Sequence, residues 1–343
     1  MASTEKRFNV AIVGATGAVG ETMIRVLEER GFPVDKLFLL ASSRSEGKRV
    51  EFRSGWLQVT NLADFDFSQV QIALFSAGGS VSAEYAPKAA AAGAVVIDNT
   101  SHFRRDDDIP LVVPEVNPEA IAGYKNRGII ANPNCSTIQM LVALKPIYDA
   151  VGITRINVCT YQAVSGTGQS AIEELAGQTA ALLSAKPMET EVYPKQIAFN
   201  VLPHIDTFED NGYTREEMKM VWETHKIFGD DSIGVNPTAV RVPVFYGHSE
   251  AIHIETREAI SAADATRLLE QANGVEVVDR QEDGGYPTAV TEAADSDLVY
   301  VGRIRNDPAN ALGLNLWVVA DNVRKGAATN SVQIAEELIK NYF

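Results

Sequence analysis

The sequence predicts an α/β protein with a parallel sheet in its N-terminal half and a second α+β domain whose sheet is mainly antiparallel. Its 343 residues exceed the roughly 150 that one domain usually holds, so we expect two domains. Up to Pro133, short continuous apolar segments alternate with helical ones; after it, the apolar segments are longer and often alternate with polar residues. We therefore expect one domain at 1–133 plus 322–343 and the other at 134–321.

The first domain is expected to begin with a strand, a glycine-rich turn and a helix. Phe8 to Val13 is rich in β-forming residues, and Ala18 to Arg30 has the apolar spacing of a helix that stops at Gly31. Further strands are expected at 36–41, 70–75, 94–97 and 128–130, with an Ala-rich helix at 81–92. Continuous apolar strands separated by helices indicate a parallel sheet covered on both faces.

The second domain is expected to hold a sheet exposed on one face. Its strands are expected at 153–163, 239–245, 251–257, 298–305 and 312–320. An exposed apolar face suits a partner subunit, so we expect a homodimer or a homotetramer. Residues 173–211 are helical at first and then loop-like, as in an inserted excursion. The amphipathic segment 322–343 should pack back on the first sheet.

Composition and charge limit the possible partners. Lys and Arg number 30 and Asp and Glu 45, a net charge of −15 that disfavours nucleic acid and anionic membranes. No apolar run could span a bilayer and no signal peptide is evident, so we expect a cytoplasmic protein with a small-molecule substrate. The two cysteines provide neither a disulfide framework nor a four-Cys zinc site, and no metal is expected.

A glycine-rich turn after the first strand predicts dinucleotide binding on a Rossmann-like sheet. Glycines permit a tight turn and close approach of the backbone to a pyrophosphate, and the N–H groups of the following helix bind its charge. A turn needed only for packing is the alternative interpretation. The residues expected to contact the cofactor here are Gly14, Thr16, Gly17, Ala18 and Val19.

The end of the next expected strand favours NADP over NAD. Arg44, with Ser42 and Ser45 beside it, stands where an enzyme that uses NAD usually has an acidic residue for the ribose. A guanidinium at this position suits a 2′-phosphate. A solvated basic loop is the alternative. Ser76, which follows another strand, is a further expected cofactor contact.

Cys135 is the candidate nucleophile, because it lies at a strand-to-helix turn where a helix N-terminus stabilises a thiolate. Cys159, inside an expected strand, fits a buried structural cysteine. A thiolate beside a dinucleotide is typical of aldehyde oxidation or its reverse, which needs a group to carry protons. The candidates are His102, His204, His225, His248 and His253. His248, expected at a turn between strands, is modestly favoured over the others as the proton carrier, and His253 is expected to be a structural residue.

Motifs along the whole chain resemble the aspartate-β-semialdehyde dehydrogenase family, most closely its bacterial branch. They are GATGAVG at 14–20, Ser42 to Gly47, LVVPEVN at 111–117, NPNCST at 132–137, TYQAVSGTG at 160–168, REEMK at 215–219 and RVPVFYGHSEA at 241–251. The resemblance implies reduction of 4-phospho-L-aspartate by NADPH to L-aspartate 4-semialdehyde and phosphate through a cysteine thioester. That reaction serves the synthesis of lysine, threonine, methionine and isoleucine.

The resemblance also implies a role for each matching residue. Cys135 would be the nucleophile, His248 the acid/base, and Gln162 a substrate contact near the thiol. Arg241 would hold the substrate carboxylate and Glu216 its amine. The remaining implied residues are Lys219 and Arg104 for phosphate, Asn134 for substrate, and Ser165, Gly166 and Asn322 near the cofactor. The domain at 134–321 would be catalytic and dimerising.

The sequence leaves several choices open. Glu217 adjoins Glu216 and Arg105 adjoins Arg104, and whichever glutamate does not bind substrate is expected to be solvated. The oxyanion is expected to be stabilised by backbone N–H groups at the helix start near Cys135. Two alternative functions remain: N-acetyl-γ-glutamyl-phosphate reductase, whose acetamide would not need the Glu216 carboxylate, and a non-catalytic dinucleotide-sensing protein.

Overall fold

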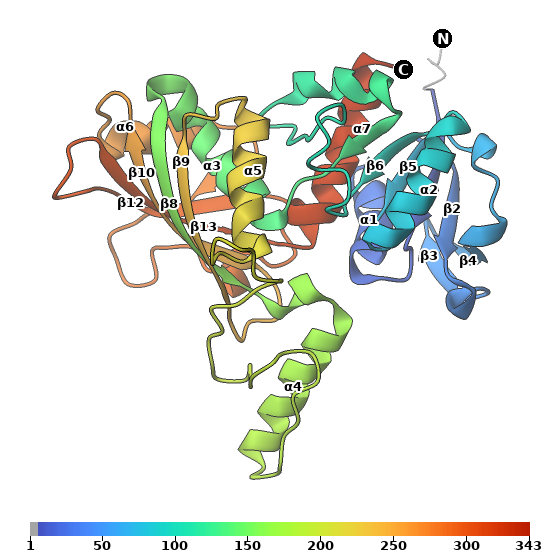
Figure 1. Ribbon diagram of the computed structural model, residues 1–343, viewed down its shortest axis with the longest axis horizontal. Coiled ribbons are helices and arrows are strands. Elements are labelled where there is room, and N and C mark those ends of the chain that lie inside the picture. Colours follow the sequence, from blue (N-terminus) through green and yellow to red (C-terminus); the bar gives the residue numbers. More distant parts are fainter. Residues whose placement is uncertain (1–5) are drawn as a thin grey trace. The chain divides into compact units, whose positions relative to one another are not determined.

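The computed structural model describes residues 6–343 (Figure 1), and the chain forms two compact units. The first unit runs to Pro133 and includes Ala327–Phe343; the second is Asn134–Gly326. Residues 322–326, which the sequence assigned to the first domain, lie in the second unit. The reason is local: Asn322 Oδ1 accepts hydrogen bonds from Ser165 Oγ (3.1 Å) and the Gly247 N–H (3.0 Å), both within that unit.

The first unit is built on a seven-stranded sheet of order β3-β4-β2-β1-β5-β6-β7. All neighbours are parallel except β3 and β4. The chain proceeds outward from β1 in both directions, so the carboxyl ends of β1 and β5 border a topological switch point. The strands are β1 (Phe8–Val13), β2 (Val34–Ala41), β3 (Arg49–Phe52), β4 (Gly55–Asn61), β5 (Ile72–Phe75), β6 (Val95–Asp98) and β7 (Ile129–Ala131).

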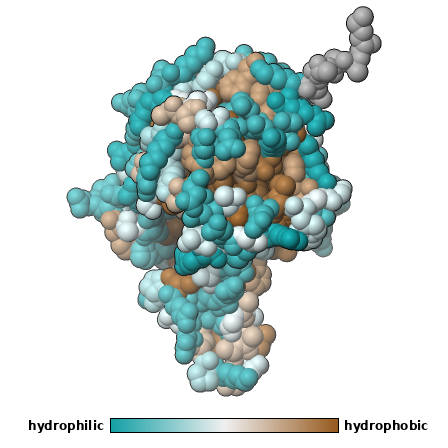
Figure 2. Space-filling view, turned by 90° about the vertical axis from the view of Figure 1, so that its right-hand side faces the viewer, coloured by the Kyte–Doolittle hydropathy of each residue, from teal (hydrophilic) through white to brown (hydrophobic). Residues whose placement is uncertain are grey.

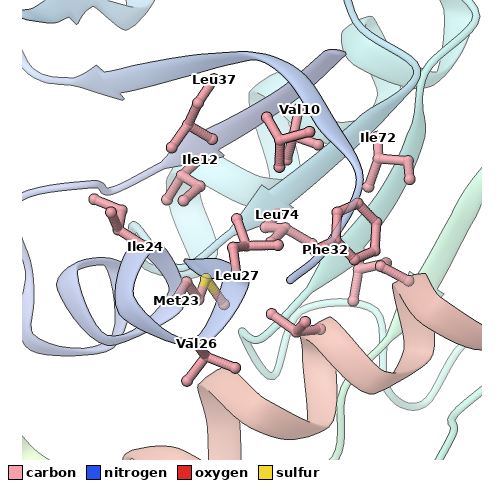
Figure 3. Packing of buried hydrophobic residues seen from close by; sticks show 14 of the residues in the cluster. Val10, Ile12, Met23, Ile24, Val26, Leu27, Phe32, Leu37, Ile72 and Leu74 are labelled. Atoms are coloured by element: carbon pink, nitrogen blue, oxygen red, sulfur yellow. The ribbon is translucent and has the colours of Figure 1, made fainter. Parts of the chain in front are cut away.

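Helices cover both faces of this sheet. α1 (Ala18–Glu29) and α7 (Thr329–Asn341) pack together on one face, whereas α2 (Gly79–Ala91) contacts β5, β6 and β7. Figure 3 shows how Met23 and Leu27 of α1 meet Ile12 and Leu74 of the strands, with Val26 directed toward α7. The right-handed crossovers from β1 to β2 and from β5 to β6 run in opposite directions, which puts α1 and α2 on opposite faces.

The β3–β4 hairpin was absent from the sequence prediction. Its strands alternate exposed residues with partly or fully buried ones at the edge of the sheet, so they lack the continuous apolar run of a buried strand. The C-terminal helix is also shorter than expected, because a π-helical turn, Arg324–Ala328, precedes it. The other expected elements of this unit are present with shifts at their ends.

The second unit is built on a six-stranded mixed sheet of order β11-β12-β13-β10-β8-β9. The central pairs are antiparallel, and the edge strands β11 and β9 pair in parallel. The sheet is therefore mainly antiparallel, as expected, with parallel pairs at its edges. The strands are β8 (Ile153–Gln162), β9 (Gly234–Arg241), β10 (His248–Thr256), β11 (Val275–Val277), β12 (Val299–Asn306) and β13 (Gly313–Ala320).

One face of this sheet is covered by three helices of the same unit. α3 (Cys135–Val151) lies against β8, β10, β12 and β13, flanked by α5 (Arg215–Phe228) and α6 (Ala262–Glu270). On the other face Cys159, His253 and Trp317 remain partly exposed in this single chain. The expectation of a sheet with one open face is confirmed.

α4 (Gln169–Leu183) opens the expected excursion and extends away from the sheet of its own unit (Figure 1). The loop that follows folds back on the helix, where Tyr193 and Ile197 pack against Leu175 in a small separate core.

Among residues 6–343, every helix is too short or too polar to cross a lipid bilayer. Figure 2 shows hydrophobic residues gathered near the middle of one face, with hydrophilic residues around them.

Candidate active site

The glycine-rich turn of the first unit lies at the carboxyl end of β1. Gly14 has φ +91°, and a Cβ there would lie 2.9 Å from the backbone of Ser76. Gly17 is the N-cap residue of α1, and a Cβ on Gly20 would lie 2.1 Å from the carbonyl oxygen of Gly14. Gly14 is therefore required for the conformation of the turn, and Gly20 is required for close packing of α1 against it.

Side chains from neighbouring strands gather at the same edge of the sheet. Ser42 and Arg44 are exposed at the end of β2, and Thr16 Oγ1 donates to Ser45 Oγ (3.2 Å). The Ser76 N–H, at the end of β5, donates to the Val13 carbonyl (2.8 Å), and the buried Ser76 hydroxyl has no hydrogen-bond partner among the residues that the structure describes. This edge combines small residues, the Ser76 hydroxyl and the accessible guanidinium of Arg44, and this combination suits a phosphorylated dinucleotide.

Arg104 also belongs to the first unit. Its side chain is buried, and Nη2 donates to the carbonyl oxygen of Asn99 (2.7 Å). Arg105 is exposed. The two adjacent arginines thus differ in burial.

In the second unit, Cys135 is the first residue of α3. Asn134 caps the helix: its Oδ1 accepts from the N–H groups of Ser136 (3.1 Å) and Thr137 (3.3 Å). The cap therefore already uses these two N–H groups of the helix start. A Cβ on Gly326 would lie 2.7 Å from Cys135 Cβ, so residue 326 must be glycine for its backbone to lie beside the thiol.

Glu216 is the centre of a buried hydrogen-bond network. Its Oε1 accepts from Asn134 Nδ2 (2.9 Å) and Gln162 Nε2 (3.1 Å), and its Oε2 pairs with Lys219 Nζ (3.0 Å). Burial raises the pKa of this carboxyl, but Lys219 and the amide donors outweigh burial and lower the pKa to about 2. Glu216 is therefore a fixed anion next to the residue that precedes Cys135.

Glu217 has a different role from its neighbour. Its side chain accepts from the Thr214 N–H (2.7 Å) and the Ala239 N–H (3.0 Å), and its own N–H donates to Thr214 Oγ1 (3.3 Å). This is a capping box at the start of α5. The expectation that the second glutamate is solvated is wrong, since Glu217 is buried and stabilises the helix.

Ala163 joins Arg241 and His248, and the sequence did not indicate it. Its N–H donates to His248 Nδ1 (3.0 Å), and its carbonyl oxygen accepts from Arg241 Nη1 (2.7 Å). Because Nδ1 accepts, the neutral imidazole carries its hydrogen on Nε2, a buried atom that has no hydrogen-bond partner in the described part of the chain. Burial and the charge of Arg241 lower the pKa of His248 to about 3. His248 begins β10, whereas the sequence predicted a turn.

Ser165, Gly166 and Asn322 lie around His248 within the second unit. Asn322 holds Ser165 and the Gly247 N–H, and a Cβ on Gly166 would lie 3.4 Å from His248 Nε2. The other histidines lie elsewhere: His253 pairs with Asp307 (2.9 Å) on the open face of the sheet, and His225 contacts the Ile233 carbonyl (2.8 Å). His204 stacks on Phe208, and exposed His102 contacts Phe103.

Glu250 is a buried acid that sequence reasoning did not identify. It follows His248 on the same face of β10, opposite Thr160 of β8. Burial raises its pKa well above the ordinary 4.5, and the neighbouring Gln139 side chain offsets only part of that effect. The folded protein thus keeps this proton at pH values where the unfolded chain has lost it.

Glu250→Gln should remove a pH dependence of stability. Between about pH 4.5 and the raised pKa, the folded state binds one more proton than the unfolded state, so wild-type stability falls with rising pH by about 1.4 kcal/mol per unit. The neutral amide lacks this slope, so thermal unfolding should show the variant gaining on wild type as pH rises. Glu255→Gln, at a partly exposed site on the same strand, should not. If the unfolding temperatures of wild type and Glu250→Gln change equally with pH, the raised pKa of Glu250 is contradicted.

The comparisons with known proteins agree with one another over most of the chain. Residues 9–124 match the family model for the NAD binding domain of semialdehyde dehydrogenase, and residues 144–325 match the model for its dimerisation domain. Aspartate-semialdehyde dehydrogenase 2 of Vibrio cholerae is 67% identical over 338 residues, or 98% of this chain and 99% of that protein. This chain belongs to the aspartate-semialdehyde dehydrogenase family.

Solved structures of aspartate-semialdehyde dehydrogenases share the fold. The crystal structure of aspartate semialdehyde dehydrogenase II from Vibrio cholerae, complexed with ASA, aligns with a TM-score of 0.97 at 67% identity and covers 99% of this chain and 100% of that one. The enzyme from Candida albicans, solved with NADP, aligns with a TM-score of 0.76 at 26% identity, covering 97% and 99%. The expected activity, aspartate-semialdehyde dehydrogenase, is confirmed, and the alternatives are not favoured.

Proposed function

We propose that this chain reduces 4-phospho-L-aspartate to L-aspartate 4-semialdehyde and phosphate with NADPH, using Cys135 as nucleophile. The observation that carries the proposal is the hydrogen-bonded set in the second unit, in which Asn134, Glu216, Gln162 and Ala163 connect the Cys135 helix to Arg241 and His248. It combines a nucleophile, a proton carrier, a fixed anion and a fixed cation. These are the groups that an amino acid with an activated side chain requires.

The recognition of substrate follows from charge. Arg241 is buried and its Nε has no hydrogen-bond partner within residues 6–343, so a substrate carboxylate would find unused donor capacity there. Glu216 stays ionised in its buried position and suits the substrate ammonium. Lys219, bonded to Glu216, and Arg104 of the first unit are the cations assigned to phosphate. Because an N-acetylated substrate has no ammonium, the Glu216 anion favours the free amino acid.

The chemistry begins when the Cys135 thiolate attacks the acyl carbon. The bond from that carbon to the phosphate oxygen breaks, and phosphate leaves with the electron pair, which forms the thioester. NADPH, when bound, supplies the hydride that reduces the thioester carbon. The oxyanion formed by hydride addition takes the proton of His248 Nε2, a role that the occupied N–H groups of Ser136 and Thr137 do not fill, and returns it to Nε2 as the C–S bond breaks. Breaking the C–S bond then releases the aldehyde and the thiolate.

The activity is tested with the purified chain in the oxidative direction, with NADP, phosphate and aspartate semialdehyde, by absorbance in the nicotinamide band. Turnover that requires phosphate is the expected result. Turnover with N-acetylglutamate semialdehyde in place of aspartate semialdehyde would indicate the sibling reductase. Tight cofactor binding without turnover on either aldehyde would indicate a sensor, and each of these results contradicts the proposal.

Arg44→Ala should weaken the use of NADPH far more than that of NADH. The exposed guanidinium at the end of β2 is the group assigned to the 2′-phosphate, which only NADPH carries. We expect the ratio of kcat/KM for the two cofactors to fall by roughly 10- to 100-fold, as for loss of a charge-assisted pair worth about 1.5 to 3 kcal/mol. Lys48→Ala, an exposed neighbour, is the matched control. An unchanged ratio in Arg44→Ala would mean that Arg44 is only a solvated loop charge.

The chain is assigned as a homodimer through the open face of the six-stranded sheet. Side chains on that face, including those of Cys159 and Trp317, are partly exposed in the single chain, and a partner subunit would cover them. Light scattering of the purified protein distinguishes a dimer from the homotetramer that is the alternative. The cytoplasmic location stays a prediction.

A further inference from the structure

Lys219 lies between two carboxylates, of which the reaction needs only one. Its Nζ is 3.0 Å from Glu216 Oε2 and 2.8 Å from Asp206 Oδ2. Mutual attraction raises the pKa of the lysine and lowers the pKa of Asp206, although burial acts against both shifts. At neutral pH this cluster therefore consists of one cation and two anions, an excess of one negative charge where phosphate is assigned to bind.

The two carboxylates differ in how firmly they are held. Glu216 is buried, and both of its oxygens have partners in the network that includes Asn134 and Gln162. The Asp206 side chain is 32% exposed, and among residues 6–343 its hydrogen-bond donors are Lys219 Nζ and the N–H of Thr207 (2.8 Å). Asp206 can therefore turn toward solvent when another anion takes its place on Lys219, whereas Glu216 cannot.

The backbone keeps Asp206 next to Lys219. Asp206 has φ +68°, which is uncommon for a residue other than glycine. The Thr207 carbonyl accepts the Arg215 N–H (2.7 Å), and Phe208 forms a β-bridge with Thr214, so the loop is tied to the start of α5. The helix that carries Glu216 and Lys219 thus also positions the loop that carries Asp206.

We propose that Asp206 is a competing counter-ion for Lys219: it occupies the lysine when phosphate is absent, weakens phosphate binding and promotes phosphate release. The inference rests on the proposed assignment of Lys219 to phosphate and extends it. An incoming phosphate must displace the Asp206 carboxylate or bind beside it. Displacement costs free energy because it breaks the ion pair with Lys219, and binding beside the carboxylate costs free energy because like charges approach within a few ångströms. In the reductive direction, the same carboxylate replaces the departing phosphate on Lys219.

Asp206→Asn tests the proposal, because it keeps the shape and removes the charge. In the oxidative direction the KM for phosphate should fall roughly 5- to 50-fold, the range expected for removing one negative charge near an anion in partly solvated surroundings. Product inhibition by phosphate in the reductive direction should strengthen by a similar factor. The KM for aspartate semialdehyde should stay within about twofold, a split that a merely structural change would not produce.

Matched variants complete the test. Asp210→Asn removes the same charge from an exposed position of the same loop and should leave the phosphate constants unchanged. Asp206→Glu keeps the carboxylate and should retain wild-type phosphate affinity. Asp206→Gly accommodates the positive φ, so it provides a second charge-free variant if asparagine destabilises the loop; it too should lower the KM for phosphate.

A Lys219→Met background separates this inference from the proposed function. If Lys219→Met raises the KM for phosphate and Asp206→Asn then adds nothing, both the site and the counter-ion are supported. If Lys219→Met raises it but neither charge-free variant of Asp206 lowers it in the wild-type background, the inference fails and the phosphate site stands. If Lys219→Met leaves it unchanged, the phosphate assignment itself fails. A rise in the KM for aspartate semialdehyde alone in Asp206→Asn would assign Asp206 to the amine and also overturn the inference.

Discussion

Cys135→Ser is expected to abolish turnover, by on the order of 10³-fold or more, while cofactor affinity stays close to that of wild type. A serine hydroxyl is far less ionised than a thiol at neutral pH, so it cannot replace the thiolate at the start of α3. The cofactor residues assigned at the edge of the first sheet are untouched by this change. The measurements are kcat in the oxidative direction and the dissociation constant of NADPH by fluorescence titration.

Cys159→Ser is the matched control for the nucleophile. Cys159 lies on β8 with its side chain on the open face of the sheet, opposite Ala251 of β10, whereas Cys135 lies on the helix that covers the other face. Its replacement should change stability or subunit association and leave kcat near wild type. Comparable losses of kcat in both variants, or in neither, would remove Cys135 from the nucleophile's role.

His248→Asn is expected to lower kcat by on the order of 10² to 10⁴, the range for losing one positioned proton-transfer group. The asparagine side chain can still face the Ala163 N–H, but it cannot present the donor that imidazole carries on Nε2. His253→Asn, which removes the contact with Asp307 on the open face of the sheet, should chiefly alter stability or association. A near-normal kcat in His248→Asn would show that another group carries the proton.

The pH profile gives a second readout for His248. Burial and Arg241 hold the pKa at about 3 in the free enzyme, so the imidazole is neutral above that pH and the acid limb of kcat/KM should lie near 3 rather than near 6.5. A substrate carboxylate on Arg241 would offset the charge that lowers the pKa. The acid limb of kcat, which reports the complex, should therefore lie at a higher pH than that of kcat/KM, and His248→Asn should remove both limbs.

Local signals in the sequence determined the identity of the family, the parallel sheet and most candidate residues. GATGAVG and NPNCST combine glycines, a cap and a cysteine within a few positions, so their chemistry can be read from neighbouring residues. The strands of the first sheet were predictable because burial on both faces requires continuous apolar runs. The β3–β4 hairpin was not, because an edge strand carries no such requirement.

Only the tertiary structure decided which of two adjacent residues faces the site. Glu216 and Glu217 are equivalent in sequence, yet one joins Gln162 and Asn134 while the other caps α5, because successive helical residues point about 100° apart. Ala163 acts through its backbone, Asp206 through a contact with a helix farther along the chain, and Gly326 through the space it leaves beside Cys135. Such roles depend on distances between segments remote in sequence, so folding alone determines them.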